Sequence, residues 1–571
     1  MQGLRAARRK LESALQAYED ACLTITKCSW LGITSDGQTL SEMIETEIES
    51  YATFCSKAVR SRAILKRVRN AIPSLVPIYY LPDELLLRIF YSVMHQNLFA
   101  LENIIDDYSL PTHILAISQV CSQWRQIALD SRGLWTDIQI STPYKMLALG
   151  ETLADRAGEL PLDIRIVEPF GGWYFDRRAR GSIISFFSRV GAQVASFKFD
   201  MITPLNENLS RTHMHFLERS LMNLRPGQCT RLTLTDRNSN AGEELEDECY
   251  ETSEHWFLLP RSTTIPASNH ASTVSLDIDP EHFEDVLAQV TILELNSMVY
   301  PYWTSKAYHG LVELSLMGPR RLTTVITIQQ LAGIMTSSPY LRVLYFGLEV
   351  SLTKVAPRPV HLADLETFLL HSLHHDTQQA VLNLIDSGPK PLQMSTTYNE
   401  LSLGCLPASF EDEFRRFFVR SNIVELEIHG SEPEVKMPEL LKLLPNLEIL
   451  IIRNSHIEYI KPSDQDKLSG VACPRLHTLR LRYCSFPLDA FQWIASVCDL
   501  QNVTLLHCTI LPETGIPYHR AEGYESTLKA ICPAIRFVYH MHDAADGIEE
   551  RAPMDLNSRI PTASLTDYKL Y

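Results

Sequence analysis

The stretch "LVELSL" at positions 311–316 has the pattern apolar-x-x-apolar-x-apolar, and the chain repeats this pattern many times after residue 135. Clear copies begin at Leu311, Leu341, Leu365, Ile423, Leu447, Leu476 and Leu500. Weaker copies are "VASFKF" at 194–199, "CTRLTL" at 229–234, "VTILEL" at 290–295 and "YNELSL" at 398–403. The copies recur at a spacing of one strand plus one helix, for example 24 residues from Phe346 to Leu370 and 29 from Ile452 to Leu481.

Helix-like stretches lie between these strands, at 327–339 ("TIQQLAGIMTSSP"), 438–446 ("PELLKLLPN") and 487–499 ("PLDAFQWIASVCD"). A strand and a helix repeated at this period are typical of leucine-rich repeats, in which stacked units bury the apolar face that one unit cannot bury alone. We therefore expect an α/β fold, a curved solenoid with a parallel sheet on its concave face. The alternative, a doubly wound α/β domain, is disfavoured by the number of copies and the lack of a glycine-rich phosphate loop.

Composition and charge limit the function classes. The 571 residues carry a net charge of −16, are 45% hydrophobic and contain no uninterrupted apolar run long enough for a membrane helix. The charged N-terminus lacks the apolar stretch of a signal peptide, and the twelve cysteines form no CxxC pair. We expect a cytoplasmic or nuclear protein, or one present in both compartments, with reduced thiols, no membrane association and no nucleic acid as its main ligand.

The first 72 residues form a separate helical leader. Helices are expected at 1–28 and 41–72, joined by "WLGITSDGQT" at 30–39. In the second helix an apolar row recurs at steps of three and four residues: Ile44, Ile48, Tyr51, Cys55, Ala58 and Leu65. A helical hairpin is the first interpretation and a coiled-coil dimer the second. The basic run at 57–69 is either a localisation or docking signal or a solvated helix face.

Catalytic and metal-binding motifs are absent from the sequence. It contains no GxxxxGK[ST], HExxH, GxSxG or EF-hand pattern. The best group of metal-ligand residues, His371, His374 and His375, lacks a fourth ligand at a fixed spacing. We therefore expect no enzyme activity, no metal and no cofactor.

A second decisive stretch is "LPDELLLRIF" at 81–90. Pro82 suits the first position of a helix, and Asp83 and Glu84 complement the helix dipole in the first turn. Apolar residues then surround most of the helix, and a second apolar stripe follows in "ISQVCSQWRQIA" at 117–128. These short helices share too small a core for their apolar content, so part of that surface should contact a partner.

The order "LPDELLLRIF … VCSQWRQIA … LW" resembles the F-box, the helical module by which substrate receptors dock onto the Skp adaptor of cullin-RING ubiquitin ligases. "LADRAGELPLDIRI" at 153–166 is similar to the first unit after the F-box in F-box/leucine-rich-repeat proteins. The connection at 95–113 is longer than is usual in the family. The resemblance implies adaptor contacts, some of which could instead fill the core of the module: Leu81, Pro82, Leu85, Ile89, Phe90, Val93, Val120, Cys121, Trp124 and Arg125.

The resemblance also predicts a domain order and a function. The domains would be a leader (1–72), an F-box (78–136), irregular leucine-rich repeats (137–540) and a poorly ordered tail (541–571). The protein would be the substrate-recognition subunit of an SCF ubiquitin ligase; the alternatives are an interaction scaffold with a vestigial F-box and an unrecognised hydrolase. Candidate target-binding residues, which could instead pack between repeats, are Trp173, Tyr174, Phe175, Arg177, Arg178 and Trp303.

Overall fold

The structure is a computed structural model, and its chain falls into two compact units, Met1–Leu86 and Leu87–Tyr571, which are described separately. The residues it describes are 2–30, 37–70, 77–96, 113–141, 145–167, 177–201, 211–236, 255–260, 271–318, 325–353, 355, 357–371, 375–397, 408–429, 434–458, 475–511, 519–520 and 524–538.

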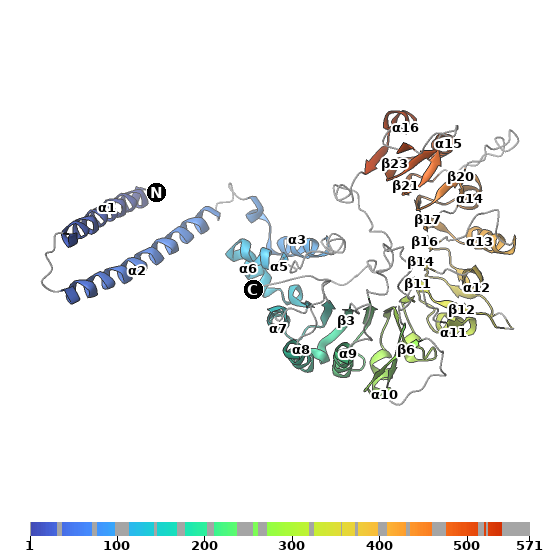
Figure 1. Cartoon of the computed structure of the whole chain (residues 1–571), viewed down its shortest axis with the longest axis horizontal. Coiled ribbons are helices and arrows are strands. Elements are labelled where there is room, and N and C mark those ends of the chain that lie inside the picture. The colour runs from blue at the N-terminus through green and yellow to red at the C-terminus, as the bar shows by residue number, and fades with distance from the viewer. Residues whose placement is uncertain are drawn as a thin grey trace. The chain divides into compact units, whose positions relative to one another are not determined.

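The first unit contains two long helices, α1 (Gln2–Trp30) and α2 (Gly37–Asn70), followed by the 3-10 turn η1 (Pro77–Tyr80). The two helices run antiparallel, as Figure 1 shows. The Tyr18 and Tyr51 rings stack with centroids 6.1 Å apart, and the Tyr18 hydroxyl donates a 3.0 Å hydrogen bond to Glu47. The helical hairpin expected from the sequence is therefore present.

Short helices follow. They are α3 (Asp83–Gln96), α5 (His113–Val120), α6 (Ser122–Asp130) and the 3-10 turn η2 (Arg132–Trp135). Residues 97–112, which include most of the long connection noted in the sequence, lie outside the described residues.

Among the described residues of the second unit, fourteen strands form one parallel sheet in chain order. Its strands are β1 (Asp137–Ser141), β2 (Leu162–Val167), β3 (Val194–Met201), β4 (Arg231–Asp236), β7 (Ile292–Asn296), β9 (Glu313–Met317), β11 (Val343–Gly347), β14 (Thr367–Leu370), β16 (Leu392–Thr397), β17 (Ile423–His429), β19 (Ile449–Arg453), β21 (Thr478–Arg482), β23 (Asn502–Leu506) and β26 (Ile535–Val538). Successive strands that pair only with their chain neighbours are what stacked repeats require.

The pairing register confirms the repeat template. The last apolar positions of the clear copies lie in one row across the sheet, interrupted only by Thr396: Leu316, Phe346, Leu370, Ile428, Ile452, Leu481 and Leu505. All seven are buried. The apolar positions of the template therefore build the continuous core, because alternate residues of a strand face the same side of the sheet.

One weak copy was placed wrongly. The strand that pairs with both β14 and β17 is β16, at 392–397, whereas the sequence template predicted "YNELSL" at 398–403. Residues 398–403 lie outside the described residues. The neighbouring strands select "LQMSTT" because Leu392 and Met394 can enter the shared core, where both are fully buried.

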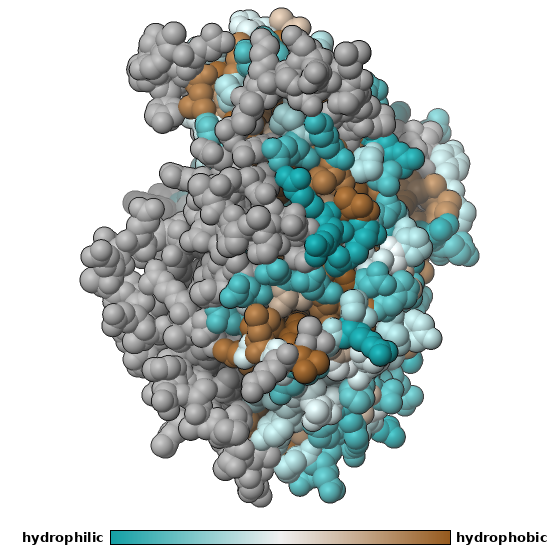
Figure 2. Space-filling model, turned by 90° about the vertical axis from the view of Figure 1, so that its right-hand side faces the viewer, coloured by the Kyte–Doolittle hydropathy of each residue, from teal (hydrophilic) through white to brown (hydrophobic). Residues whose placement is uncertain are grey.

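Helices cover the outer side of the curved sheet, as Figure 1 shows. They are α7 (Lys145–Ala157), α8 (Arg177–Val190), α9 (Arg211–Asn223), α10 (Pro280–Leu287), α11 (Ile328–Ser337), α12 (His375–Leu384), α13 (Ala408–Arg420), α14 (Met437–Leu443), α15 (Leu488–Val497) and α16 (Glu525–Ile531), with the 3-10 turns η3 (Gly191–Gln193) and η5 (Lys306–Tyr308). Seen from this side, the described surface is mainly hydrophilic with separate apolar patches (Figure 2).

Short strands form small additional sheets beside the large one. They are β10 (Val325–Thr327) with β12 (Glu349–Ser351), β13 (Val360–Leu362) with β15 (Ile385–Ser387), β5 (His255–Pro260) with β6 (Ala271–Leu276) and β8 (Met298–Val299), and a ladder of β18 (Glu434–Lys436), β20 (His456–Glu458), β22 (Ser485–Pro487), β24 (Thr509–Leu511) and β25 (His519–Arg520).

The turn that leaves a repeat strand has a recurrent backbone conformation. The residue directly after β7, β19, β21 and β23 has a positive φ of 49–61°. These residues are Ser297, Asn454, Tyr483 and His507. Because this left-handed region costs free energy for residues other than glycine, its recurrence shows that the repeat geometry imposes it.

Candidate functional site

Helix α3 begins one residue later than the sequence predicts, at Asp83 and not at Pro82. The backbone N–H groups of Leu85 and Leu86 donate hydrogen bonds of 3.0 and 3.1 Å to the carbonyl of Pro82, so this proline precedes the first helical residue, Asp83. Asp83 and Glu84 occupy the first turn, where negative charge stabilises the helix dipole.

The apolar surface of α3 divides into two stripes. Leu86, Phe90 and Met94, spaced four residues apart, are almost completely buried. Leu85 and Ile89 form a neighbouring stripe and are 43% and 38% exposed. A helix with apolar residues on both stripes but only one of them covered presents the other to solvent, as the sequence led us to expect.

Helices α5 and α6 of the same helical module carry further exposed apolar side chains. Val120 at the end of α5 is 58% exposed, whereas Ile114, Leu115 and Ile117 of the same helix are buried. The Trp124 ring of α6 is half-buried and lies 4.9 Å from the Phe90 ring, centroid to centroid. The exposed Val120 and the half-buried Trp124 therefore belong to helices whose other apolar residues are packed, and this packing fixes their positions.

Two predicted contact residues have a structural role inside the module. The Sγ atom of Cys121 accepts a hydrogen bond from the backbone N–H of Trp124 at 3.4 Å and so caps the start of α6. The Arg125 Nε atom donates a 2.9 Å hydrogen bond to the Ser118 carbonyl and ties α6 to α5. Cys121 and Arg125 therefore fix the position of α6 relative to α5.

The predicted contact residues therefore fall into two groups, one buried and one at least partly exposed. Phe90 is 1% exposed, so its assignment as a surface contact is corrected: it packs in the core of the module against Trp124. The others retain exposed or partly exposed surface: Leu81, Pro82, Leu85, Ile89, Val93, Val120, Cys121, Trp124 and Arg125.

The helical module joins the solenoid through Trp135, which is fully buried. Its indole Nε1 donates a 2.7 Å hydrogen bond to the carbonyl of Ala128, and the Arg156 guanidinium lies 4.5 Å above its ring. Strand β1 follows immediately and pairs with β2. These contacts link the α6 segment to the first repeat.

The target-binding residues proposed from the sequence are not brought together among the described residues. Trp173, Tyr174 and Phe175 lie outside the described residues. Arg177 and Arg178 begin α8, and their side chains are also outside the description. Trp303 is only 9% exposed and packs 5.6 Å from the Tyr308 ring, so its assignment to a target surface is corrected to a packing role.

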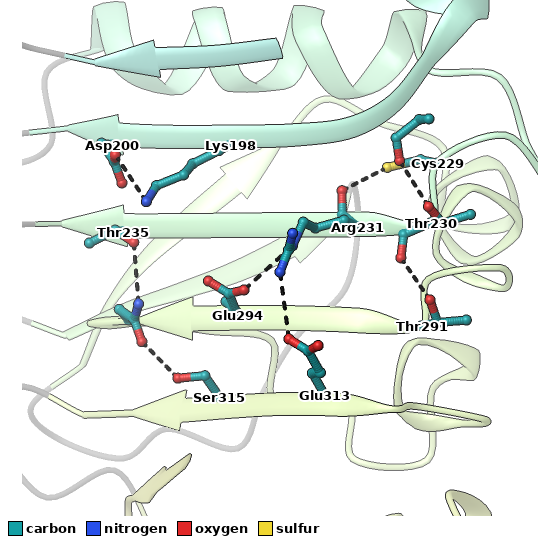
Figure 3. A network of polar contacts seen from close by, with 12 residues as sticks. Lys198, Asp200, Cys229, Thr230, Arg231, Thr235, Thr291, Glu294, Glu313 and Ser315 are labelled. Atoms are coloured by element: carbon teal, nitrogen blue, oxygen red, sulfur yellow. Dashed lines mark hydrogen bonds and ion pairs between the residues drawn. The ribbon is translucent and has the colours of Figure 1, made fainter. Parts of the chain in front are cut away.

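The sheet face opposite the helices carries a polar network that the sequence analysis missed (Figure 3). The Nε and Nη2 atoms of Arg231 lie 3.7 Å from Glu294 and 3.5 Å from Glu313. On the next row, Asn296 donates a hydrogen bond of 3.3 Å to Thr235 and accepts one of 3.1 Å from Ser315. The signal was available in the x positions of the strand template, which place polar residues on this face at every second residue.

Burial changes the acid strength of carboxylates in this network. It raises the pKa of Glu294 to about 7, although Arg231 opposes the rise. It also raises the pKa of Asp163 on β2 to about 6, again against Arg231. A buried carboxylate favours its neutral form because the charged form loses its hydration.

Farther along the same face the character changes to apolar and then to charged. Met317, Val343, Tyr345 and Leu369 form an apolar cluster on β9, β11 and β14. On β17 and β19, Glu427 contacts Arg453 at 2.6 Å and His429 at 3.2 Å. Along the inner face the chemistry of these largely buried side chains thus changes from polar to apolar to charged.

Two cysteine thiols of the solenoid are buried and have raised pKa values. Burial raises the pKa of the Cys229 thiol to about 12 and that of Cys484 to about 11, so neither is a poised nucleophile. Within the described segments no cluster of three His, Cys, Asp or Glu side chains is arranged to hold a metal ion. No helix among them combines the length and apolar character needed to cross a bilayer.

The comparisons with known proteins concern the helical module and the repeats separately. Residues 78–141 match the F-box-like family model, so the chain carries an F-box-like domain, and the repeat strands described above follow it. F-box domains generally bind Skp-type adaptors, and F-box and leucine-rich-repeat families are typically non-catalytic. Together the two parts support a role in protein–protein interaction.

Among solved structures, the chain is similar to the crystal structure of an internalin from Listeria monocytogenes. The identity is 12%, the TM-score is 0.26, and the match covers 74% of this chain and 92% of the internalin. The search of curated proteins gave no match.

Proposed function

We propose that this protein is the substrate-recognition subunit of an SCF cullin-RING ubiquitin ligase, acting in the cytoplasm, the nucleus or both. In this role the F-box-like domain binds a Skp-type adaptor and the solenoid binds a target protein. The observation that carries the proposal is the open apolar stripe of α3, with Leu85 and Ile89, in a domain that matches the F-box-like family.

The physical argument rests on the cost of exposed apolar surface. Ile89 and Val120 are exposed at positions that a partner protein would remove from water, which stabilises the complex by about 25 cal/mol per Å² of apolar area. The Phe90–Trp124 contact and the Arg125–Ser118 hydrogen bond hold the helices beneath them in place. A surface fixed before binding loses little conformational entropy when the partner docks.

The solenoid supplies the second half of the proposed role. Its inner face carries the Arg231 network, the Tyr345 cluster and the Glu427–Arg453 pair along a continuous row of strands, and these largely buried contacts hold in place the sheet on which a target would dock. A target held there would be kept near the ligase, and the gain is one of effective concentration. The chain itself would make or break no bond.

Co-purification with a Skp-type adaptor tests the proposal. The full-length protein should retain the adaptor, and the double variant Ile89→Glu/Val120→Glu should weaken retention at least about a hundredfold, since two charges would be placed in an apolar contact. Val419→Glu is the matched control, because Val419 is 71% exposed on α13 of the solenoid and should leave retention unchanged.

The alternative is an interaction scaffold with a vestigial F-box. It predicts that the wild-type protein retains no adaptor while its solenoid still captures a target. Circular dichroism of the double variant separates a lost contact from lost folding, because helix α3 is solvent-exposed at Ile89 and should remain helical.

A further inference from the structure

The helical hairpin α1–α2 exposes most of its apolar side chains. Among the described residues, half of the exposed large hydrophobic side chains belong to these two helices, and none of the buried hydrophobic ones does. Leu15 is 48% exposed and Phe54 is 56% exposed. A pair of helices that buries no core is not stable by itself in water, because helix stability in proteins comes mainly from packing an apolar face.

Apolar residues of both helices are regularly spaced along the chain. On α1, Leu4, Leu11, Tyr18 and Ile25 recur every seven residues, and on α2 so do Ile44, Tyr51, Ala58 and Leu65. The Tyr18–Tyr51 stack fixes the antiparallel register of the two rows. A seven-residue repeat of apolar positions is the pattern by which helices associate into bundles and coiled coils.

In two antiparallel helices, residue numbers that face each other have a constant sum. Because 15 and 54 have the same sum as 18 and 51, the Tyr18–Tyr51 stack sets Leu15 opposite Phe54. Both residues lie next to the tyrosine pair and near the middle of their helices. Although the register pairs them, Leu15 and Phe54 remain largely exposed, so the hairpin's own two helices leave this apolar pair uncovered.

Charge is divided along the length of the hairpin. The half near the connecting loop, residues 17–30 and 37–52, is acidic, with one basic residue: Glu19, Asp20, Lys27, Glu42, Glu45, Glu47 and Glu49. The opposite half, residues 2–16 and 53–70, is basic, with one acidic residue: Arg5, Arg8, Arg9, Lys10, Glu12, Lys57, Arg60, Arg62, Lys66, Arg67 and Arg69. Like charges within each half would repel those of an identical neighbour lying parallel to it.

We propose that the hairpin binds a second copy of this chain in an antiparallel, two-fold arrangement and so forms a four-helix bundle. The acidic half of each copy then lies against the basic half of the other, and Leu15 and Phe54 of both copies meet near the two-fold axis. A two-fold interface needs a surface that is complementary to itself, and a surface acidic at one end and basic at the other meets that condition when one copy is reversed.

This pairing would place two F-box-like domains and two solenoids in one particle. A target with two binding sites would then be held more tightly than by a single solenoid. The inference uses only residues of α1 and α2, and it holds whether or not the F-box-like domain binds an adaptor.

The mass of the full-length protein in solution is the first test. Light scattering coupled to size exclusion should give twice the 64.9 kDa of one chain at micromolar concentration. Leu15→Glu/Phe54→Glu should give the mass of one chain, and the control Val419→Glu should give the wild-type mass. A wild-type mass of one chain, a mass above two chains, or a double variant that still pairs would overturn the proposal.

Charge exchange tests the antiparallel arrangement and does not depend on the apolar variant folding. One variant, Arg5→Glu/Arg8→Glu/Arg9→Glu/Lys10→Glu/Lys57→Glu/Arg60→Glu, changes the net charge of the basic half from +9 to −3. A second, Glu19→Lys/Glu42→Lys/Glu45→Lys/Glu49→Lys, changes the net charge of the acidic half from −5 to +3. Each alone should pair at least about tenfold more weakly than wild type, because both of its contacts become repulsive.

Mixing the two charge variants should restore the double mass, since in the mixed pair both contacts again join opposite charges. In a parallel pair like charges face each other in wild type and in each variant, so neither variant would pair more weakly than wild type. Undiminished pairing of the separate variants, or no pairing in the mixture, would overturn the arrangement.

Discussion

The hairpin and the solenoid differ in the burial of their apolar side chains. In α1 and α2 large apolar side chains face solvent, whereas in the solenoid the repeated apolar strand residues, such as Phe346 and Ile452, are buried. The solenoid completes its core along the chain, because each repeat covers the next. Two helices alone have no such neighbour, so the same kind of side chain becomes an interaction surface.

The largest expected difference between the two regions is the cost of removing a phenylalanine. Phe368 on β14 is fully buried and lies 5.9 Å from the Phe417 ring, so Phe368→Ala should lower the free energy of unfolding by about 3–5 kcal/mol. Phe54→Ala in the hairpin should change the unfolding of the solenoid by less than about 0.5 kcal/mol. Urea unfolding followed by tryptophan fluorescence measures both. Equal effects would contradict the contrast.

The second test uses pH. Burial raises the pKa of Glu294 to about 7 from its ordinary value of 4.5, so between these values the folded state holds a proton that the unfolded chain has released. Stability should therefore fall as pH rises through this window, by about 3 kcal/mol from this residue, and the contribution is lost above pH 7. Glu294→Gln should reduce the difference between the urea midpoints at pH 5 and pH 8. A difference equal to that of wild type would show that Glu294 is not buried as described.

The junction between the helical module and the solenoid should show an intermediate effect. Trp135→Phe removes the hydrogen bond to the Ala128 carbonyl and leaves that buried acceptor unpaired, at a cost of about 1–3 kcal/mol. Trp124→Phe is the matched control, because Trp124 is only half-buried and should cost less. Chemical denaturation of both variants decides the order, and a larger loss for Trp124→Phe would reverse the expected ranking.

The smallest effect concerns one helix start in the solenoid. Thr327 and Gln330 form a reciprocal capping box at the beginning of α11. Thr327→Ala should cost about 1 kcal/mol, and Thr327→Ser should retain most of the stability because serine keeps the hydroxyl. Thermal unfolding measures this difference; identical curves for the alanine and serine variants would show that the cap does not contribute.

The sequence predicted the repeat strands well because their pattern is local and recurs many times. Leu316, Phe346 and Ile452 occupy one row of the sheet, as the template requires. It failed at β16, where a better local match at 398–403 competed with "LQMSTT". Strand pairing with β14 and β17 decided that position, and such contacts join residues that are distant in the chain.

The candidate site was predicted less completely for the same reason. Pattern and resemblance selected both Ile89 and Phe90, but only packing against Trp124 separates the exposed residue from the buried one. Trp303 looked suitable for a partner surface until its contact with Tyr308 placed it inside. The Arg231 network was missed because its acidic partners come from two later strands.

Local pattern was enough to predict most of the repeat strands, the F-box-like motif that begins at Leu81, and the charge division of the hairpin. These properties depend on residues that are neighbours along the chain. Tertiary structure alone decided which stripe of α3 stays open and which carboxylate is buried beside Arg231. Burial is set by contacts between distant segments, so it follows from the folded chain and not from local pattern.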